Sequence, residues 1–500
     1  MFQIASPESV GISSKRVLEF VKALEQYNLN THSILMARGN QIFAEAYYAP
    51  FDMNTKHRMY SVSKSFTAIA VGLAEQEGLL SLDDKLMKYF PEYRNENTDA
   101  LYEETTIRDL LTMRSCIANK DPDYWGKPDR VKAYLEMSSN KIPGTNFSYD
   151  STGSFLLTCI VEKLTGKPFM EYLKEKILLD IGFSKDAYCL LAPGGHSHGD
   201  SGVMCTSRDL LTFARFVMNG GQWNGKRYLN EEFIHAAISK QTDSNPSGVS
   251  GGYNDYGYGY LIWKAPRDGF AFVGMANQFA ICDPKTDSIF VITSENMGNG
   301  NNARMLIYHE LYKTIVENMG ESLPEDEIAY EQLKAYMAER KMIALCSDVH
   351  SGIESEINGK VYTLEPNPMA ITSVKVTITG NKGEFEYYNE EGRNTIQFGI
   401  GYNEFGRFPG KKRMSLTASV YEEGAYACGA SAAWCEDAKL HIMVRVIDTF
   451  MGTLSIMLSF KDDRISLSMN RHAQRILDGL QGNAVGCRRS DVVYDSNCSV

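Results

Sequence analysis

The stretch that decides the fold reads Tyr60-Ser61-Val62-Ser63-Lys64-Ser65-Phe66. Apolar residues at helical spacing follow, so we expect an amphipathic helix over residues 61–78 with the stripe Phe66, Ile69, Ala70, Leu73 and Ala74. Ser61 and Lys64 are three residues apart and would share one helix face. The serine would lie at the positive end of the helix dipole, beside unpaired backbone N–H groups. A lysine that burial keeps neutral can remove a serine proton, so the pair has the chemistry of an activated nucleophile.

The plain alternative is an N-cap serine followed by a solvated lysine, because S-x-x-K occurs by chance in many helices. A second motif lies at Tyr149-Asp150-Ser151, which follows the Pro143-Gly144 turn and precedes a predicted helix over residues 156–164. Tyr149 could share a proton with Ser61 and Lys64. Its alternative is a buried aromatic residue with a hydrogen-bonded hydroxyl.

Composition limits the class of protein. The chain has 500 residues, of which 43% are hydrophobic and 23% charged, which is typical of a globular protein of about two or three domains. The net charge of −11 argues against a nucleic-acid or anionic-membrane partner. Charges interrupt each apolar stretch before the roughly 18 residues that a membrane span needs. The N-terminus lacks the pattern of a signal peptide, so we expect a cytoplasmic protein.

Cysteine and histidine patterns point to no cofactor. None of the 10 cysteines forms a C-x-x-C pair, and several lie in apolar runs, which is typical of reduced, buried thiols. The 9 histidines are scattered, and the close pair His196 and His198 has no carboxylate or cysteine array around it. We therefore expect neither a metal site nor another cofactor.

The organisation of the chain predicts two domains. A helix and a strand–turn–strand unit fill residues 1–50, helical patterns fill most of residues 100–220, and strand patterns return at 258–263, 270–273 and 288–293. These patterns predict an α+β domain over residues 1–320, with an antiparallel sheet assembled from its two ends and an inserted helical subdomain. A polar helix over 321–345 would connect it to residues 346–500, where period-two runs predict an all-β barrel or curved sheet.

The combination of motifs resembles one enzyme superfamily over about residues 5–315. Besides the two motifs above, four segments stand in the family's order and spacing: Thr106–Thr112, Thr165–Phe169, Ser207–Leu210 and Tyr256–Tyr260. The chain resembles the serine hydrolases that include class C β-lactamases, penicillin-binding DD-peptidases and related esterases and D-aminopeptidases. The resemblance implies a β-lactamase-like fold for the first domain. Some relatives also append β-barrel domains, so we expect a lipocalin-like barrel at the C-terminus, either a cap over the substrate site or a stabilising or dimerising module.

The resemblance also implies roles for site residues. Ser61 would be the acylated nucleophile, Lys64 its activator and Tyr149 the general acid/base. Ser151 replaces an asparagine that contacts substrate in relatives. The third family element aligns with Gly274-Met275-Ala276-Asn277-Gln278, so Met275 stands where relatives carry a cation and Asn277 where they carry glycine. The backbone N–H groups of Gln278 and Ser61 would form the oxyanion hole.

The resemblance implies a hydrolase for an ester or amide bond of a small-molecule or peptide-like substrate. In β-lactamases and DD-peptidases the third element helps to bind a substrate carboxylate, which Met275 cannot do, so a neutral acyl part is expected. An arginine from elsewhere, His196 or His198 could restore the charge. An acyltransferase and a catalytically silent sensor or binding protein are the alternatives. Homo-oligomerisation stays open.

Overall fold

The computed structural model describes residues 2–96, 98–117, 124, 127–245, 255–346, 350–410, 412–413, 421–422, 425–473 and 476–489. It separates into two compact units, with the division between Met342 and Ile343. Across these ranges, no helix is both long and apolar enough to traverse a bilayer.

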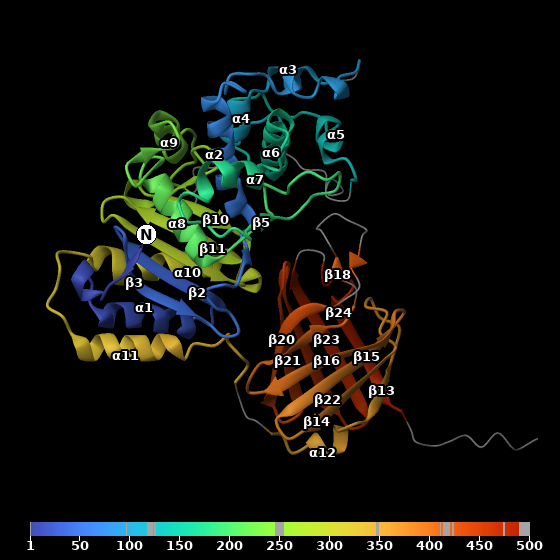
Figure 1. Cartoon of the computed structure of the whole chain (residues 1–500). Coiled ribbons are helices and arrows are strands. Elements are labelled where there is room, and N and C mark those ends of the chain that lie inside the picture. The colour runs from blue at the N-terminus through green and yellow to red at the C-terminus, as the bar shows by residue number, and fades with distance from the viewer. Residues whose placement is uncertain are drawn as a thin grey trace, which may run out of the picture. The chain divides into compact units, whose positions relative to one another are not determined.

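The first unit is built on a seven-stranded sheet with the order β1-β3-β2-β12-β11-β10-β9 (Figure 1). Its strands are β1 (Gln3–Ile4), β2 (Thr31–Arg38), β3 (Gln41–Tyr47), β9 (Trp263–Lys264), β10 (Phe270–Gly274), β11 (Gln278–Asp283) and β12 (Ser288–Ser294). The pairs are antiparallel except β1–β3. Because β2 pairs with β12, the two ends of the predicted domain meet in one sheet, as expected.

Side chains alternate across this sheet and create two cores. On β2, Ile34 and Met36 face a cluster that includes residues of the helices α1 (Ser14–Gln26), α10 (Gly300–Glu310) and α11 (Glu327–Ala338). Leu35 and Ala37 belong to the cluster on the other face. The remaining helices are α2 (Ser63–Gln76), α3 (Ala100–Glu104), α4 (Ile107–Leu111), α5 (Arg130–Leu135), α6 (Ser151–Thr165), α7 (Phe169–Leu173), α8 (Ser207–Met218) and α9 (Glu231–Ile238). Successive side chains of a strand point to opposite faces of the sheet, so a strand in the middle of this domain contributes to both cores.

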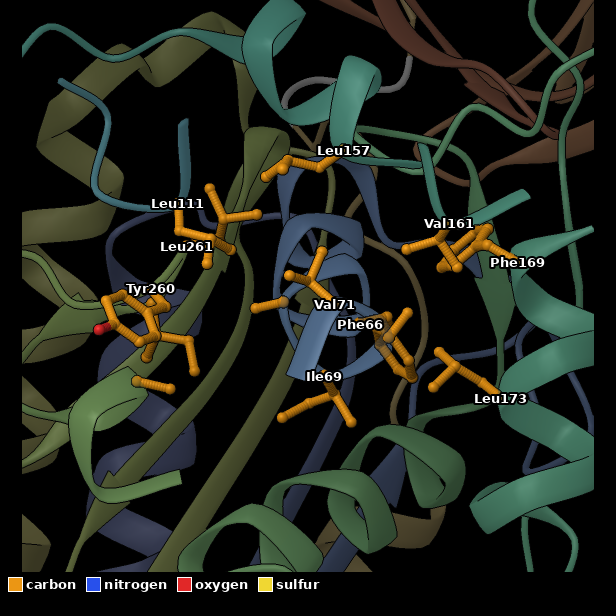
Figure 2. Packing of buried hydrophobic residues seen from close by; sticks show 14 of the residues in the cluster. Phe66, Ile69, Val71, Leu111, Leu157, Val161, Phe169, Leu173, Tyr260 and Leu261 are labelled. Carbon is orange, nitrogen blue, oxygen red and sulfur yellow. The ribbon is translucent and has the colours of Figure 1, made fainter. Parts of the chain in front are cut away.

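The helix α2 differs from the predicted amphipathic helix. Every residue from Ser63 to Ala74 is buried, so the helix is enclosed on its whole circumference rather than along one stripe. Phe66 stacks on Phe213 with ring centroids 3.8 Å apart, and Figure 2 shows Phe66, Ile69 and Val71 packed among side chains of several other elements. A helix enclosed in this way holds the residues at its N-terminus in one position.

The predicted strand at 258–263 is mostly absent. The strand β9 contains only Trp263 and Lys264, and Leu261 has a φ of 54°. This left-handed conformation turns the backbone, which a strand does not do. Alternating aromatic residues suggested an extended segment here, whereas Tyr258 and Tyr260 are both buried in the core of the helical side.

The helix expected to connect the domains packs on the first unit. Leu333 of α11 is fully buried in the same cluster as Leu24 of α1, and Arg340 Nη1 donates to Glu25 Oε1 at 2.8 Å. The structure therefore includes this segment, up to Met342, in the first unit.

The second unit contains a β-barrel. Its sheet has the order β16-β15-β14-β13-β24-β23-β22-β21-β20-β17, and a further parallel pairing of β16 with β20 closes it. The strands are β13 (Val361–Leu364), β14 (Ser373–Thr379), β15 (Lys382–Asn389), β16 (Gly392–Ile400), β17 (Glu404–Phe408), β20 (Tyr426–Glu436), β21 (Lys439–Ile447), β22 (Met451–Lys461), β23 (Arg464–Ala473) and β24 (Gly482–Arg488). On β21, Leu440, Ile442 and Val444 are completely buried, as their period-two spacing predicts.

Candidate active site

Ser61 lies in a short helical turn, η2 (Tyr60–Val62), directly before α2. Tyr60 has a φ of 45°, which is strained for an aromatic residue. Two contacts hold this turn: the Met59 N–H donates to the Val203 carbonyl at 2.8 Å, and the Arg58 guanidinium lies 4.7 Å from the Tyr60 ring centroid. The serine is partly exposed at a backbone position that its surroundings fix.

Lys64 is buried beside this serine. Its side chain is 1% exposed, its Nζ lies 3.0 Å from Ser61 Oγ, and it donates to the Asp200 carbonyl oxygen at 2.7 Å. The lysine is therefore not the solvated residue of the plain alternative. The structure brings Ser61 and Lys64 to the separation that proton transfer requires.

Tyr149 lies next to Lys64, although 85 residues separate the two in sequence. The Lys64 Nζ is 5.1 Å from the Tyr149 ring centroid. The ring stacks on Trp263 with centroids 5.6 Å apart and meets Tyr258 edge to face. These aromatic contacts fix the ring plane, and the acid/base role of the hydroxyl stays a prediction.

The residues after Tyr149 anchor the motif. Asp150 is buried and caps α6 by accepting the Thr152 N–H at 3.0 Å, and it also accepts the Tyr134 hydroxyl at 2.8 Å. Ser151 is the first residue of α6, and Lys64 bonds Ser61 and Asp200 rather than Ser151. A substrate contact for Ser151 stays a prediction.

The third family element forms the turn between β10 and β11, called η8 (Met275–Asn277). A Cβ added at Gly274 would lie 2.4 Å from the Met59 carbonyl oxygen, so the turn begins beside the segment that carries Ser61. Gln278 opens β11 opposite Gly274, and its side-chain amide donates to the Ser294 carbonyl at 2.6 Å. The structure therefore places the Gln278 peptide near the nucleophile turn, while its role as an oxyanion donor stays a prediction.

The turn explains why Asn277 can stand where relatives have glycine. Its φ is 68°, a left-handed conformation that asparagine adopts more readily than most residues. The neighbouring Ala276 has a φ of 60°, and Ser294 Oγ donates to both carbonyls at 2.8 and 2.9 Å. The turn keeps its shape without a glycine.

Met275 is partly exposed and uncharged, and a candidate cation, Arg304, lies on α10. The Arg304 guanidinium carbon is 5.5 Å from the ring centroid of Trp263, the residue on which Tyr149 stacks. Arg304 Nε and Nη2 have no hydrogen-bond partner among the residues that the structure describes.

Sequence reasoning missed Asp200, which lies between β5 (Tyr188–Cys189) and β6 (Val203–Cys205). Its carboxylate is completely buried, 2.6 Å from His198 Nδ1 and 3.6 Å from Arg130 Nη2. Burial works against its ionised form, but the electrostatic effect of His198, Arg130 and Lys64, together with the hydrogen bond from His198, holds the pKa of Asp200 well below its usual value. No spacing rule links this aspartate to Lys64, so the sequence carried no signal for it.

The two histidines of the close pair each contact a carboxylate. His198 is buried on Asp200, and burial lowers its pKa to about 4, so it is neutral at physiological pH. His196 Nδ1 pairs with Glu162 Oε2 at 2.9 Å. Within the described ranges, no group of three His, Cys, Asp or Glu residues could hold a metal ion.

Comparisons with known proteins identify the family of the chain. The family model described as "Beta-lactamase" matches residues 19–312. The chain is 25% identical over 285 residues to the 6-aminohexanoate-dimer hydrolase of Paenarthrobacter ureafaciens, covering 52% of this chain and 71% of the relative. It is 25% identical over 260 residues to penicillin-binding protein 4* of Bacillus subtilis (strain 168), covering 44% and 55%. A crystal structure of a family VIII carboxylesterase matches with a TM-score of 0.51 and 16% identity, covering 63% of this chain and 99% of that one, a likeness of fold alone.

Proposed function

Since the chain belongs to the beta-lactamase family, we propose that it is a serine hydrolase that forms an acyl-enzyme on Ser61 and cleaves an ester or amide bond of a small substrate. The observation that carries this proposal is the 3.0 Å contact between Ser61 Oγ and the buried Lys64 Nζ. A nucleophile within reach of a desolvated base is the arrangement that acyl transfer needs.

The proposed reaction has two halves. Neutral Lys64 takes the Ser61 proton while Oγ bonds to the substrate carbonyl carbon, and collapse of the tetrahedral intermediate breaks the bond to the leaving group. The leaving group receives a proton through Lys64 and the Tyr149 hydroxyl. Water then attacks the acyl carbon, its proton returns by the same residues, and Ser61 is released with the acid product.

Two backbone N–H groups are proposed to stabilise the negative oxygen of the intermediate. They belong to Ser61, in the turn η2, and to Gln278, at the start of β11. Support comes from the close approach of Gly274 to Met59, which joins the two turns. A donor of this kind typically contributes about 3 kcal/mol to the transition state.

The preferred substrate is proposed to have a neutral acyl part. Met275 offers no charge, and the Tyr149 ring beside Lys64 packs against the rings of Tyr258 and Trp263. The names of relatives and fold neighbours include both an amide-type dimer hydrolase and a carboxylesterase, so they do not choose between the two bonds.

A fluorophosphonate probe tests the proposal. The wild-type chain should gain one label by intact mass, and Ser61→Ala should lose both the label and turnover of p-nitrophenyl acetate. Ser65→Ala is the matched control, because Ser65 also lies near the start of α2 but is buried and donates to the Leu261 carbonyl at 3.2 Å. A label that persists in Ser61→Ala contradicts the assignment, and a wild-type chain that takes no label favours a silent binding protein.

A further inference from the structure

The segment from His198 to Gly202 closes over the buried side of Lys64. It is held at several points: Thr67 Oγ1 donates to the Gly199 carbonyl at 2.9 Å, and Arg58 Nε donates to the Ser201 carbonyl at 2.9 Å. Between these points the Asp200 carbonyl accepts the Lys64 Nζ at 2.7 Å. The amine end of the lysine is therefore directed toward Ser61 by a fixed peptide oxygen behind it.

The side chain of the same aspartate lies in a cluster of cations. Lys64, Arg130 and Arg58 all act electrostatically on the Asp200 carboxylate, which is completely buried. Arg130 is equally buried, packed with its guanidinium carbon 4.1 Å from the Phe155 ring centroid. A buried cation needs a counter-charge, and the Asp200 carboxylate supplies it to Arg130 and Arg58 at once.

The other titratable groups that act on Asp200 add no further charge at neutral pH. Burial lowers the pKa of His198 to about 4 and raises the pKa values of the remaining three groups, Tyr124, Cys159 and Cys189. Around Lys64 itself the described polar neighbours are Ser61, Tyr149 and Asp200. The carboxylate of Asp200 is therefore the anion built into this site.

We propose that Asp200 is a positioning residue for Lys64: its peptide oxygen orients Nζ toward Ser61, and its buried carboxylate is the counter-ion of the ammonium that forms when Lys64 takes the Ser61 proton. The inference rests on the proposed function. In the acylation step one proton moves from Ser61 Oγ to Lys64 Nζ, so a charge develops on the lysine while Asp200 stays ionised throughout. A fixed charge next to a developing one stabilises the transition state without reorganisation.

The test is the pH profile of fluorophosphonate labelling between pH 5 and pH 10. Asp200→Asn removes an anion that stabilises the protonated form of Lys64. The acidic limb of the labelling-rate profile should therefore move to lower pH by about one unit. The labelling rate on the alkaline plateau should fall about 10-fold, because a weaker base accepts the proton. Asp186→Asn is the control, since Asp186 is 72% exposed and pairs with Lys56, and its profile should match the wild type.

Arg130→Met covers the case in which Asp200→Asn does not fold. This variant removes a cation from a cluster with excess positive charge, and methionine can fill the space against Phe155. The Asp200 carboxylate then acts more strongly on Lys64, so the acidic limb should move to higher pH. Opposite shifts in the two variants support the inference, and if Asp200→Asn is unfolded, an unshifted limb in Arg130→Met overturns it. A limb that stays within about 0.3 units of wild type in every folded variant overturns it. A wild-type chain that takes no label contradicts the proposed function instead.

Discussion

Replacing Lys64 by methionine separates its chemical role from its packing role. The lysine is 1% exposed, and methionine has nearly the same length, so the space that the lysine side chain occupies stays filled. The Asp200 carbonyl loses its donor, which costs about 1–3 kcal/mol. Removing a buried polar group, the Lys64 amine, offsets part of this cost. We therefore expect the free energy of unfolding to change by no more than about 2 kcal/mol.

The catalytic effect should be much larger than the effect on stability. Ser61 Oγ has Lys64 Nζ as its basic neighbour at 3.0 Å, and a positioned base contributes about 10²- to 10⁴-fold. This range corresponds to about 2.7–5.5 kcal/mol of activation free energy. The fluorophosphonate labelling rate of Lys64→Met should therefore fall at least 100-fold relative to wild type.

A second buried lysine provides the control. Lys174 lies in the helical turn η6 (Lys174–Leu178), its side chain is 9% exposed, and it pairs with Glu171 at 2.9 Å. Lys174→Met should keep the wild-type labelling rate, which excludes a general effect of losing a buried cation. If folded Lys64→Met reacts at more than about a tenth of the wild-type rate, Lys64 is not the base and the reasoning fails.

Four further outcomes are expected. Tyr149→Phe should lower kcat by about 10²-fold because it removes the hydroxyl proposed to carry the proton, and an unchanged kcat would make Tyr149 structural only. Penicillins should be hydrolysed with a lower kcat/KM than p-nitrophenyl acetate, since Met275 cannot pair with a carboxylate; if the order is reversed, loss of that activity in Arg304→Met would identify the cation. Burial lowers the pKa of His57 to about 4, so the unfolded state binds more protons between pH 4 and about pH 6.5. Thermal unfolding should show about 3 kcal/mol of stability lost as pH falls through that window, with a shallower loss in His57→Gln. A chain ending at Met342 should keep its helical circular dichroism, because both cores of the first unit consist of its own residues; an unfolded product would contradict that independence.

Short-range patterns in the sequence were sufficient for several features. The i,i+3 spacing predicted that Ser61 and Lys64 meet, because helical geometry sets that distance locally. Period-two alternation predicted strands such as β21 and β22, and the Gly380-Asn381 and Asp462-Asp463 turns separate strands where expected. These features depend only on backbone geometry over a few residues.

Other features depend on packing between distant segments. Sequence reasoning expected one apolar stripe on α2, but the neighbours of that helix come from elements up to 200 residues away, and they enclose it completely. Similarly, the alternating aromatic residues at 258–262 are turned by the left-handed Leu261, because core positions for Tyr258 and Tyr260 outweigh the local preference for a strand.

The sequence by itself determined that Ser61 and Lys64 meet, and it determined the α+β first domain and the β-rich second domain, because each follows from periodicity or from a contiguous motif. Only the tertiary structure decided what surrounds the pair. Tyr149 reaches Lys64 through the placement of α6 and the support of Trp263, and Asp200 reaches it from 136 residues away. The protonation state and orientation of a buried ionisable side chain depend on all of its neighbours. Folding brings those neighbours together from distant parts of the chain, so their order in the sequence does not reveal them.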